Sequence, residues 1–235
     1  MSAIEDIRTF LAEKQGGHEV WSGFANYTGS QRQSLGLKAD ELHAFVAQLV
    51  RAYGKQMTGA EWLDLLDTLY DGQTFEEAAL AGLLLGRLHA VRRALPLDRF
   101  DRWLGTLQGW AEVDTTCQNN FKPSDLLDRW DEWDAFLRAL SVDANINKRR
   151  ASLVLLVTPV RTSDDPRLIA LALELAEHHA PERDKLIVKA VSWVLRSAIK
   201  HHREEVASFL DAHGESLAKL VVREVRGKLD TGKKG

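Results

Sequence analysis

Apolar residues recur at spacings of three and four along most of the chain. Residues 42–50 show this spacing, and so do residues 168–175. It gathers apolar side chains on one face of a helix, so it predicts amphipathic helices. The expected helices cover residues 3–14, 39–54, 59–71, 75–94, 97–109, 123–140, 147–157, 165–179, 183–202, 204–211 and 215–229.

Proline positions support these helix boundaries. Asp165-Pro166 has the order of a helix N-cap followed by proline at the first helical position. The apolar run at residues 153–157 has the composition of a buried strand, but a single strand would have no partner, so we expect a helix there. The sequence therefore predicts an all-α fold, with the prolines lying between the periodic stretches: Pro96, Pro123, Pro159, Pro166 and Pro181.

From about residue 59 onward, the predicted helices form pairs of similar length with short connections. This pattern is typical of two-helix units stacked as a solenoid. We expect a single helical-repeat domain over residues 1–235, although 235 residues would also fit two compact units. Its expected parts are an N-terminal helix with an irregular segment (1–38), stacked helix pairs (39–229) and a flexible tail (230–235). The irregular stretch, residues 16–36, is long enough to predict a functional loop or a disordered one.

Composition narrows the class of protein. With 45% hydrophobic and 28% charged residues, the chain is typical of a globular protein with a sizeable core. It has no apolar run long enough to span a bilayer and no apolar leader, so we expect a cytoplasmic protein. Cys117 is the only cysteine, which excludes an internal disulfide and predicts a core position. The histidine pairs at 178–179 and 201–202 lack further ligands at a suitable spacing, so no metal site is expected.

Charge is distributed unevenly along the chain. The formal net charge of −3 argues against a protein that coats nucleic acid without selectivity. Residues 1–117 hold 11 Lys and Arg against 16 Asp and Glu, whereas residues 118–235 hold 20 against 18. Residues 145–203 alone hold 11 basic and 6 acidic residues. We therefore expect a local basic face in the second half of the chain.

Trp110 and Asp114 are the first candidate site residues. They are four residues apart, so a helical turn here would bring both side chains to one face. An indole face and a carboxylate together attract a cation. The alternative is a core tryptophan beside a helix cap or surface charge.

Basic residues follow two predicted helices. Three successive cations, Lys148, Arg149 and Arg150, open one of them, where backbone N–H groups also favour phosphate. The other carries a stripe at spacings of three and four that suits phosphates and one base or sugar, although a solvated cationic face would explain it equally well. The stripe consists of Lys185, Lys189, Trp193, Arg196 and Lys200.

Several ordered motifs together make the chain resemble the AlkD-type DNA alkylation repair family. The common nucleotide-binding, serine-hydrolase and zinc-protease patterns are absent from the sequence. The resemblance covers most of the chain. The segments that carry it are 27–30, 35–37, 71–77, 109–114, 145–151 and 189–196.

The resemblance implies a solenoid of HEAT-like repeats with a concave, positively charged DNA-binding face. It implies excision of cationic N3- and N7-alkylated purines without a metal or an organic cofactor. Its catalytic Trp, Asp and Arg fall on Trp110, Asp114 and Arg150, with Arg149 as the alternative for the arginine. Trp193 is then a second groove aromatic, and Tyr27 is a minor-groove or lesion-side contact.

The expected partner is double-stranded DNA containing alkylated purines, bound by a monomer that is nucleoid-associated when on DNA. A purine alkylated at N3 or N7 leaves as a neutral base, so its release needs no general acid. Asp114 would stabilise the positive charge that develops on the sugar. Two other functions remain open at this point: a catalytically silent relative that binds bent or branched DNA, and a protein-interaction scaffold.

Overall fold

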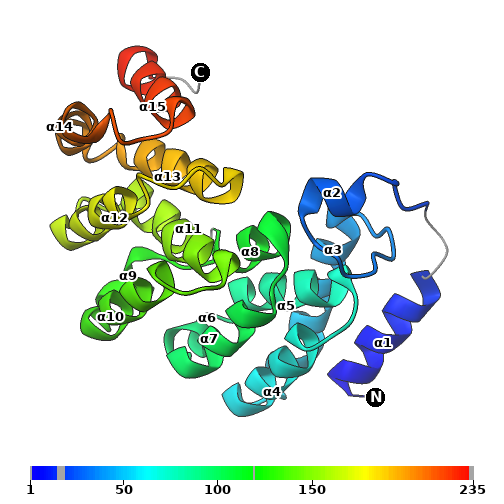
Figure 1. The fold of residues 1–235 in the computed structure, drawn as a ribbon. Helices are drawn as coiled ribbons and strands as arrows, with labels where there is room; N and C mark the ends of the chain where they lie inside the picture. Colours follow the sequence, from blue (N-terminus) through cyan, green and yellow to red (C-terminus); the bar gives the residue numbers. More distant parts are fainter. Residues whose placement is uncertain (1, 15–18, 119, 233–235) are drawn as a thin grey trace. The chain divides into compact units, whose positions relative to one another are not determined.

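The helices of the chain agree with the predicted fold class (Figure 1). A computed structural model describes residues 2–14, 19–118 and 120–232, and these residues form no strand. The all-α helical-repeat prediction is therefore confirmed. The helices are α1 (Ala3–Lys14), α2 (Phe24–Thr28), α3 (Ala39–Tyr53), α4 (Gly59–Tyr70), α5 (Phe75–Arg87), α6 (His89–Arg93), α7 (Leu97–Thr106), α8 (Gly109–Cys117), α9 (Pro123–Leu127), α10 (Trp130–Ser141), α11 (Ile146–Thr162), α12 (Pro166–His178), α13 (Lys185–Ala198), α14 (Arg203–His213) and α15 (Lys219–Thr231).

Contacts between residues gather in two compact units. Unit 1 is Met1–Thr116 and unit 2 is Cys117–Gly235. Helices α1 to α8 belong to unit 1, apart from Cys117 at the end of α8, and α9 to α15 belong to unit 2. The single domain expected over residues 1–235 stays a prediction. Across the described helices, none has both the length and the apolar character that a membrane crossing requires.

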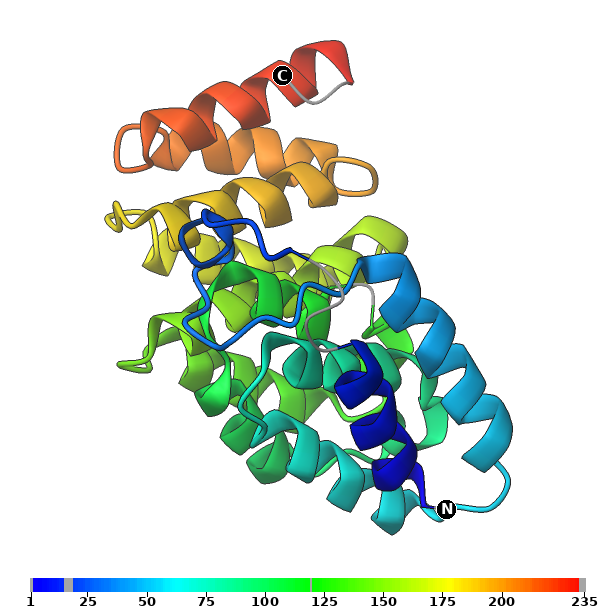
Figure 2. The same ribbon diagram turned by 90° about the vertical axis from the view of Figure 1, so that its right-hand side faces the viewer.

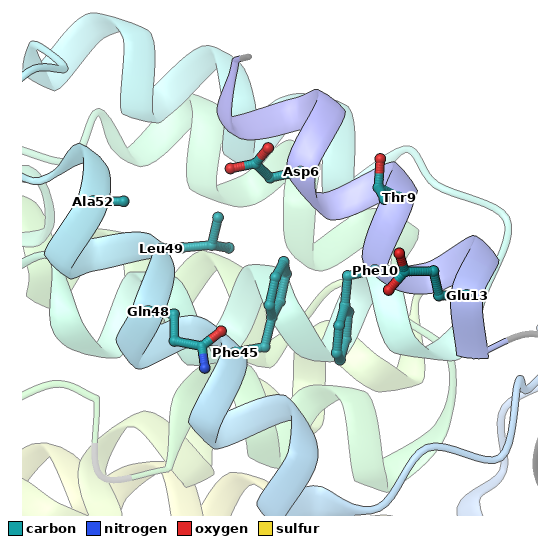
Figure 3. A pocket seen from close by; sticks show the side chains of 8 residues that line it. All are labelled: Asp6, Thr9, Phe10, Glu13, Phe45, Gln48, Leu49 and Ala52. Carbon is teal, nitrogen blue, oxygen red and sulfur yellow. The ribbon is translucent and has the colours of Figure 1, made fainter.

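In unit 1, α1 packs antiparallel against α3. The rings of Phe10 and Phe45 stack with their centroids 3.8 Å apart and their planes 6° from parallel (Figure 3). At one end of the pair Tyr53 donates a hydrogen bond to Asp6 at 2.7 Å. The two rings line an open groove of about 330 Å³ between the helices. The stacked rings and this hydrogen bond hold α1 against α3 within unit 1.

The region predicted as one helix over residues 75–94 is two helices. The backbone leaves the helical region at Leu88, which has φ −90° and ψ 70°. The buried Arg92 side chain turns back and donates hydrogen bonds to the carbonyls of Leu85 and Gly86, at 3.4 and 3.0 Å. Carbonyls at a helix end lack intrahelical partners, so this arginine satisfies them and stabilises the break.

Unit 2 is built from helix pairs in two layers. Helices α11, α13 and α15 pack against one another in chain order, and α10, α12 and α14 do the same beside them. Both ribbon views show this succession, from yellow-green to red (Figures 1 and 2). The stacked pairs predicted from the hydrophobic spacing are therefore present in this unit.

Helix α11 is the centre of unit 2. Every residue from Arg150 to Val160 is buried. A helix that is apolar on all sides has no solvent face, which is why residues 153–157 resembled a buried strand in composition. The helix prediction for this run is confirmed. The expected position of Pro159 is wrong, because this proline lies inside α11, whose last turn continues to Thr162.

Other helix boundaries also differ from expectation. The region 123–140 is divided at Arg129 into α9 and α10. The predicted helix 97–109 ends at Thr106, and a separate helix, α8, begins at Gly109. Asp165 caps α12 through the amide of Arg167, with proline at the first position, as expected.

The two segments expected to be irregular are partly helical. Within residues 16–36, the short helix α2 forms and ends at Gly29, whose φ of 75° is a left-handed value that favours glycine. At the C-terminus α15 continues to Thr231, so the expected tail begins later than residue 230; residues 233–235 lie outside the described residues. Cys117 is buried, as predicted.

Candidate active site

In unit 1, a close crossing of two backbones brings Tyr27 to Trp110. Gly29 and Gly109 both have left-handed φ, of 75° and 67°. A Cβ atom at Gly109 would lie 2.3 Å from the carbonyl oxygen of Thr28, so any larger residue would push the two segments apart. The glycines thus allow the segment after α2 to reach the N-terminal end of α8.

Three aromatic rings surround this crossing. The ring centroids of Tyr27 and Trp110 are 5.3 Å apart in an edge-to-face arrangement. The centroids of Trp21 and Tyr27 are 6.0 Å apart. Trp110 is half-buried and donates its indole N–H to the backbone carbonyl of Tyr27. Since this hydrogen bond satisfies the polar atom of Trp110, the rest of the indole is a hydrophobic surface with electron-rich faces.

Asp114 lies one turn after Trp110 on α8. The helix runs over Gly109–Cys117, so the helical turn that the sequence argument required is present. Residues four apart in a helix share a face. Both side chains are half-buried, neither fully solvated nor in the core. Unit 1 therefore offers an indole and a carboxylate next to each other on one helix.

A buried carboxylate, Glu112, holds the crossing together. Its side chain is only 1% exposed. It accepts hydrogen bonds from the Ser30 hydroxyl and, at 2.8 Å, from the backbone N–H of Gln108. Burial raises the pKa of the Glu112 carboxyl, an effect partly offset by these hydrogen bonds and by the nearby charge of Arg32. Glu112 thus links the Tyr27 segment to the first turn of α8.

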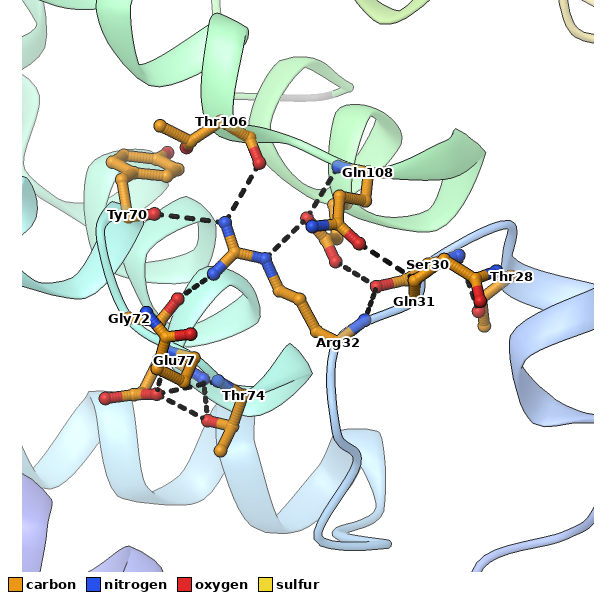
Figure 4. A network of polar contacts seen from close by, with 12 residues as sticks. Thr28, Ser30, Gln31, Arg32, Tyr70, Gly72, Thr74, Glu77, Thr106 and Gln108 are labelled. Carbon is orange, nitrogen blue, oxygen red and sulfur yellow. Dashed lines mark hydrogen bonds and ion pairs between the residues drawn. The ribbon is translucent and has the colours of Figure 1, made fainter.

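Arg32 is the cationic partner of this carboxylate (Figure 4). Its Nε lies 3.4 Å from Glu112 Oε2. Its remaining nitrogens donate to the backbone carbonyls of Gly72, Tyr70 and Thr106, the last two at 3.1 and 2.9 Å. The Tyr70 carbonyl ends α4, the Gly72 carbonyl follows it, and the Thr106 carbonyl ends α7. One guanidinium therefore joins the ends of two helices to the segment that carries Arg32.

A second buried carboxylate fixes the chain further along. Glu76 accepts hydrogen bonds from the amides of Leu35 at 2.9 Å and Gly36 at 3.0 Å, and from the Ser34 hydroxyl at 2.9 Å. Segments 35–37 and 71–77, two of the motifs that carry the family resemblance, are therefore in direct contact. In the same way, the motif at 27–30 meets the motif at 109–114.

The predicted cations at the start of α11, in unit 2, are engaged in the unit's own contacts. Lys148 Nζ lies 3.5 Å from Asp143. Arg149 pairs with Glu182 at 3.3 Å and donates to the Asp143 carbonyl at 2.9 Å. Arg150 is 4% exposed and its Nη1 donates to the Leu186 carbonyl at 2.5 Å. All three cations therefore have partners within unit 2.

The basic stripe on α13 is shorter than predicted. Lys185 and Lys189 are exposed, and Trp193 is half-buried. Arg196 donates to the Ser192 hydroxyl at 3.1 Å and pairs with Glu224 at 3.4 Å. The expected helix over 183–202 was wrong at its end: α13 stops at Ala198, so Lys200 lies in the following turn and not on the stripe.

Three residues near the candidate site were missed by the sequence argument: Trp21, Arg32 and Glu112. Glu112 lies inside the recognised motif at 109–114 but received no role. Arg32 pairs with it across 80 positions, and no local pattern indicates such a pair. Trp21 lies in the stretch expected to be functional or disordered, and a tryptophan in such a stretch was the one signal that the sequence offered. Its exposure is seen only in the structure. Trp110 and Asp114 belong to unit 1, and Arg150 and Trp193 to unit 2, so their convergence stays a prediction.

The fold and these contacts define a helical-repeat protein whose first unit displays aromatic and carboxylate side chains. The model of the DNA alkylation repair enzyme family matches residues 13–229, and the chain belongs to that family. A solved structure described as a predicted DNA alkylation repair enzyme from Enterococcus faecalis has a TM-score of 0.72 and 18% identity, covering 93% of this chain and 96% of that one. This similarity supports the fold. A search of curated proteins found no match.

Proposed function

We propose that the protein is a DNA glycosylase that releases cationic N3- and N7-alkylated purines, such as 3-methyladenine and 7-methylguanine, in base excision repair. The observation that carries the proposal is the Trp110 and Asp114 pair on α8, beside Tyr27, in a chain of the DNA alkylation repair family. An indole face and a carboxylate attract the same kind of ligand, a cation.

The chemistry suits these two residues. A purine alkylated at N3 or N7 carries a positive charge and departs as a neutral base when its glycosidic bond breaks, so no acid has to protonate it. Positive charge develops instead on the deoxyribose. Asp114 stabilises that charge and orients the water that attacks the sugar. Half-burial of Asp114 strengthens the effect, because a carboxylate acts more strongly where water is partly excluded.

Tyr27 and Trp110 bind the alkylated nucleotide through their rings. Each ring face that meets the cation contributes about 0.5–2 kcal/mol, depending on how far it is desolvated. The glycine crossing and the Glu112 and Arg32 pair fix both rings before the substrate arrives. Preorganisation of this kind lowers the free energy spent on ordering the site during binding.

Unit 2 binds the DNA backbone in this proposal. Lys185 and Lys189 are exposed on one helix and attract phosphates without reading sequence. Arg150 is assigned as the phosphate clamp and Trp193 as a groove contact.

Single-turnover release of methylated bases from duplexes that carry one lesion each tests the proposal. We expect release of 7-methylguanine and 3-methyladenine but little release of uracil, hypoxanthine or 1,N6-ethenoadenine, whose departure requires a proton donor. Comparable rates for uracil and 7-methylguanine would contradict the charge-based mechanism. Binding to DNA without release of any base would favour the silent DNA-binding relative.

A further inference from the structure

Exposed large apolar side chains are concentrated next to the candidate site. Among the described residues, the exposed large hydrophobic side chains are Val20, Trp21, Tyr27 and Val142. Three of these four lie within residues 20–27. Trp21 and Tyr27 are each 62% exposed. An indole left in water gives up the stabilisation that burial would provide, and a group of such side chains in one segment marks a binding surface.

The Trp21 ring has a defined place. The Trp21 carbonyl accepts a hydrogen bond from the Phe24 amide at 2.9 Å, just before α2. The indole folds back over Gly23: a Cβ atom at Gly23 would lie 2.3 Å from Cζ2 of the ring. Gly23 itself has an ordinary φ of −84°. The glycine is therefore needed at this position to leave room for the ring, not for the backbone.

Trp21 also continues the row of rings at the candidate site. It contacts Tyr27, which in turn contacts Trp110, at centroid distances of 6.0 and 5.3 Å. Residues 19–31 contain no lysine or arginine, and Glu19 is their one charged residue. This segment therefore has no cation for a phosphate. It has ring faces, which bind a base or another flat cation.

We propose that Trp21 is a binding residue of this site: its exposed indole stacks on the cationic purine nucleotide and extends the surface formed by Tyr27 and Trp110. The proposal rests on the proposed function for the identity of the ligand. It adds a residue and a selection rule, because contact through ring faces favours a charged base over a neutral base of the same shape. Contact through phosphates would not do so.

Duplexes with a single 7-methylguanine or with its neutral isostere, 7-deaza-7-methylguanine, test the selection rule by binding. Trp21→Ala is expected to weaken binding of the 7-methylguanine duplex by roughly 5- to 30-fold, as for one partly desolvated cation contact, and to leave the isostere duplex within about twofold. Trp21→Phe retains a ring face and should lose less. Equal losses on both duplexes, or no loss on either, would overturn the proposal.

Gly23→Ala provides a second variant that keeps the indole but displaces it. The backbone at residue 23 accepts alanine, so the fold is retained while the ring has to move. We expect Gly23→Ala to reproduce the direction of the Trp21→Ala effect, and Val20→Ala, in the same segment, to have none. If Val20→Ala weakens binding as much as Trp21→Ala, the segment acts as a whole and the assignment to Trp21 is wrong.

Release assays on the same variants separate this proposal from the proposed function. If the wild-type protein releases 7-methylguanine while Trp21→Ala binds and cleaves normally, the function stands and the role of Trp21 is rejected. If the wild-type protein releases no base but Trp21→Ala still loses preference for the cationic duplex, the glycosylase proposal fails and the role of Trp21 stands. A wild-type protein that binds none of these duplexes contradicts both.

Discussion

Units 1 and 2 use charged side chains in different ways. In unit 1 the charges near the candidate site are buried and bind backbone: Glu112 and Arg32 pair with each other and with backbone groups at the ends of α4 and α7 and just before α8. In unit 2 Arg150 is also buried and bonded to a backbone carbonyl, but Lys185 and Lys189 are exposed on α13. Residues 1–116 hold 11 basic against 16 acidic residues, whereas residues 117–235 hold 20 against 18.

In the proposed function, this difference corresponds to a division of roles between the two units. Ring faces and a carboxylate, as in unit 1, discriminate a cationic base from a neutral one. Exposed lysines, as in unit 2, attract any nucleic acid, and salt weakens that attraction. We therefore expect substitutions in unit 1 to change rate and lesion preference, and substitutions in unit 2 to change affinity and its salt dependence.

The largest effect is expected for Asp114→Asn. The amide keeps the shape of the side chain but removes the charge that stabilises the sugar cation. Release of 7-methylguanine should fall by about 100-fold or more, in line with the loss of one preorganised electrostatic contact. Affinity for damaged duplex should hold or rise. The measurement is single-turnover release with a parallel binding titration, and Asp98→Asn, an exposed site on α7, is the control. A parallel loss of affinity and rate would make Asp114 a structural residue.

Glu112→Ala should show how strongly unit 1 depends on its buried pair. The substitution leaves the Arg32 guanidinium buried beside an empty site, which typically costs about 3–5 kcal/mol in the free energy of unfolding. The comparison in unit 2 is Asp134→Ala, which removes a partly exposed partner of Arg138 and should cost less than about 1 kcal/mol. Urea denaturation of both variants gives the two values, and similar costs would refute the contrast between the units.

Lys185→Glu combined with Lys189→Glu is expected to act on affinity alone. Duplex binding at low salt should weaken by about 10-fold or more, equally for damaged and undamaged DNA, and the slope against salt should decrease by about two phosphate contacts. Binding titrations at several salt concentrations measure both. Lys55→Glu, an exposed lysine of unit 1, is the matched control. A change in lesion preference would mean that unit 2 also takes part in discrimination.

The smallest effect concerns pH. Burial raises the pKa of the Glu112 carboxyl in the folded protein, so folding favours its protonated form. The resulting stabilisation is complete below the ordinary carboxyl pKa of about 4.3 and is lost as pH rises through the raised value, by about 1.4 kcal/mol for each unit of difference. The wild-type protein should show this loss relative to Glu112→Gln, which does not titrate. A constant difference between the two proteins at all pH values would contradict it.

Hydrophobic spacing in the sequence determined most of the helices and their pairing. It located the buried α11, because helical contacts are local and depend on positions three and four residues apart. It left α8 out of the expected helices, so Trp110 and Asp114 were neighbours only on the condition that their turn is helical, as it is in the structure. Helix caps could also be predicted from the sequence, as at Asp165, because a capping residue is next to its helix in the chain.

Only the tertiary structure decided what is joined over long distances in the chain. The pairing of Arg32 with Glu112, the crossing of Gly29 and Gly109, and the row from Trp21 to Trp110 connect positions about 80 to 90 residues apart, and no local pattern encodes them. The break at Leu88 depends on the buried Arg92 side chain that binds the freed carbonyls. Local spacing fixes which face of a helix is apolar, whereas long-range packing selects what covers it.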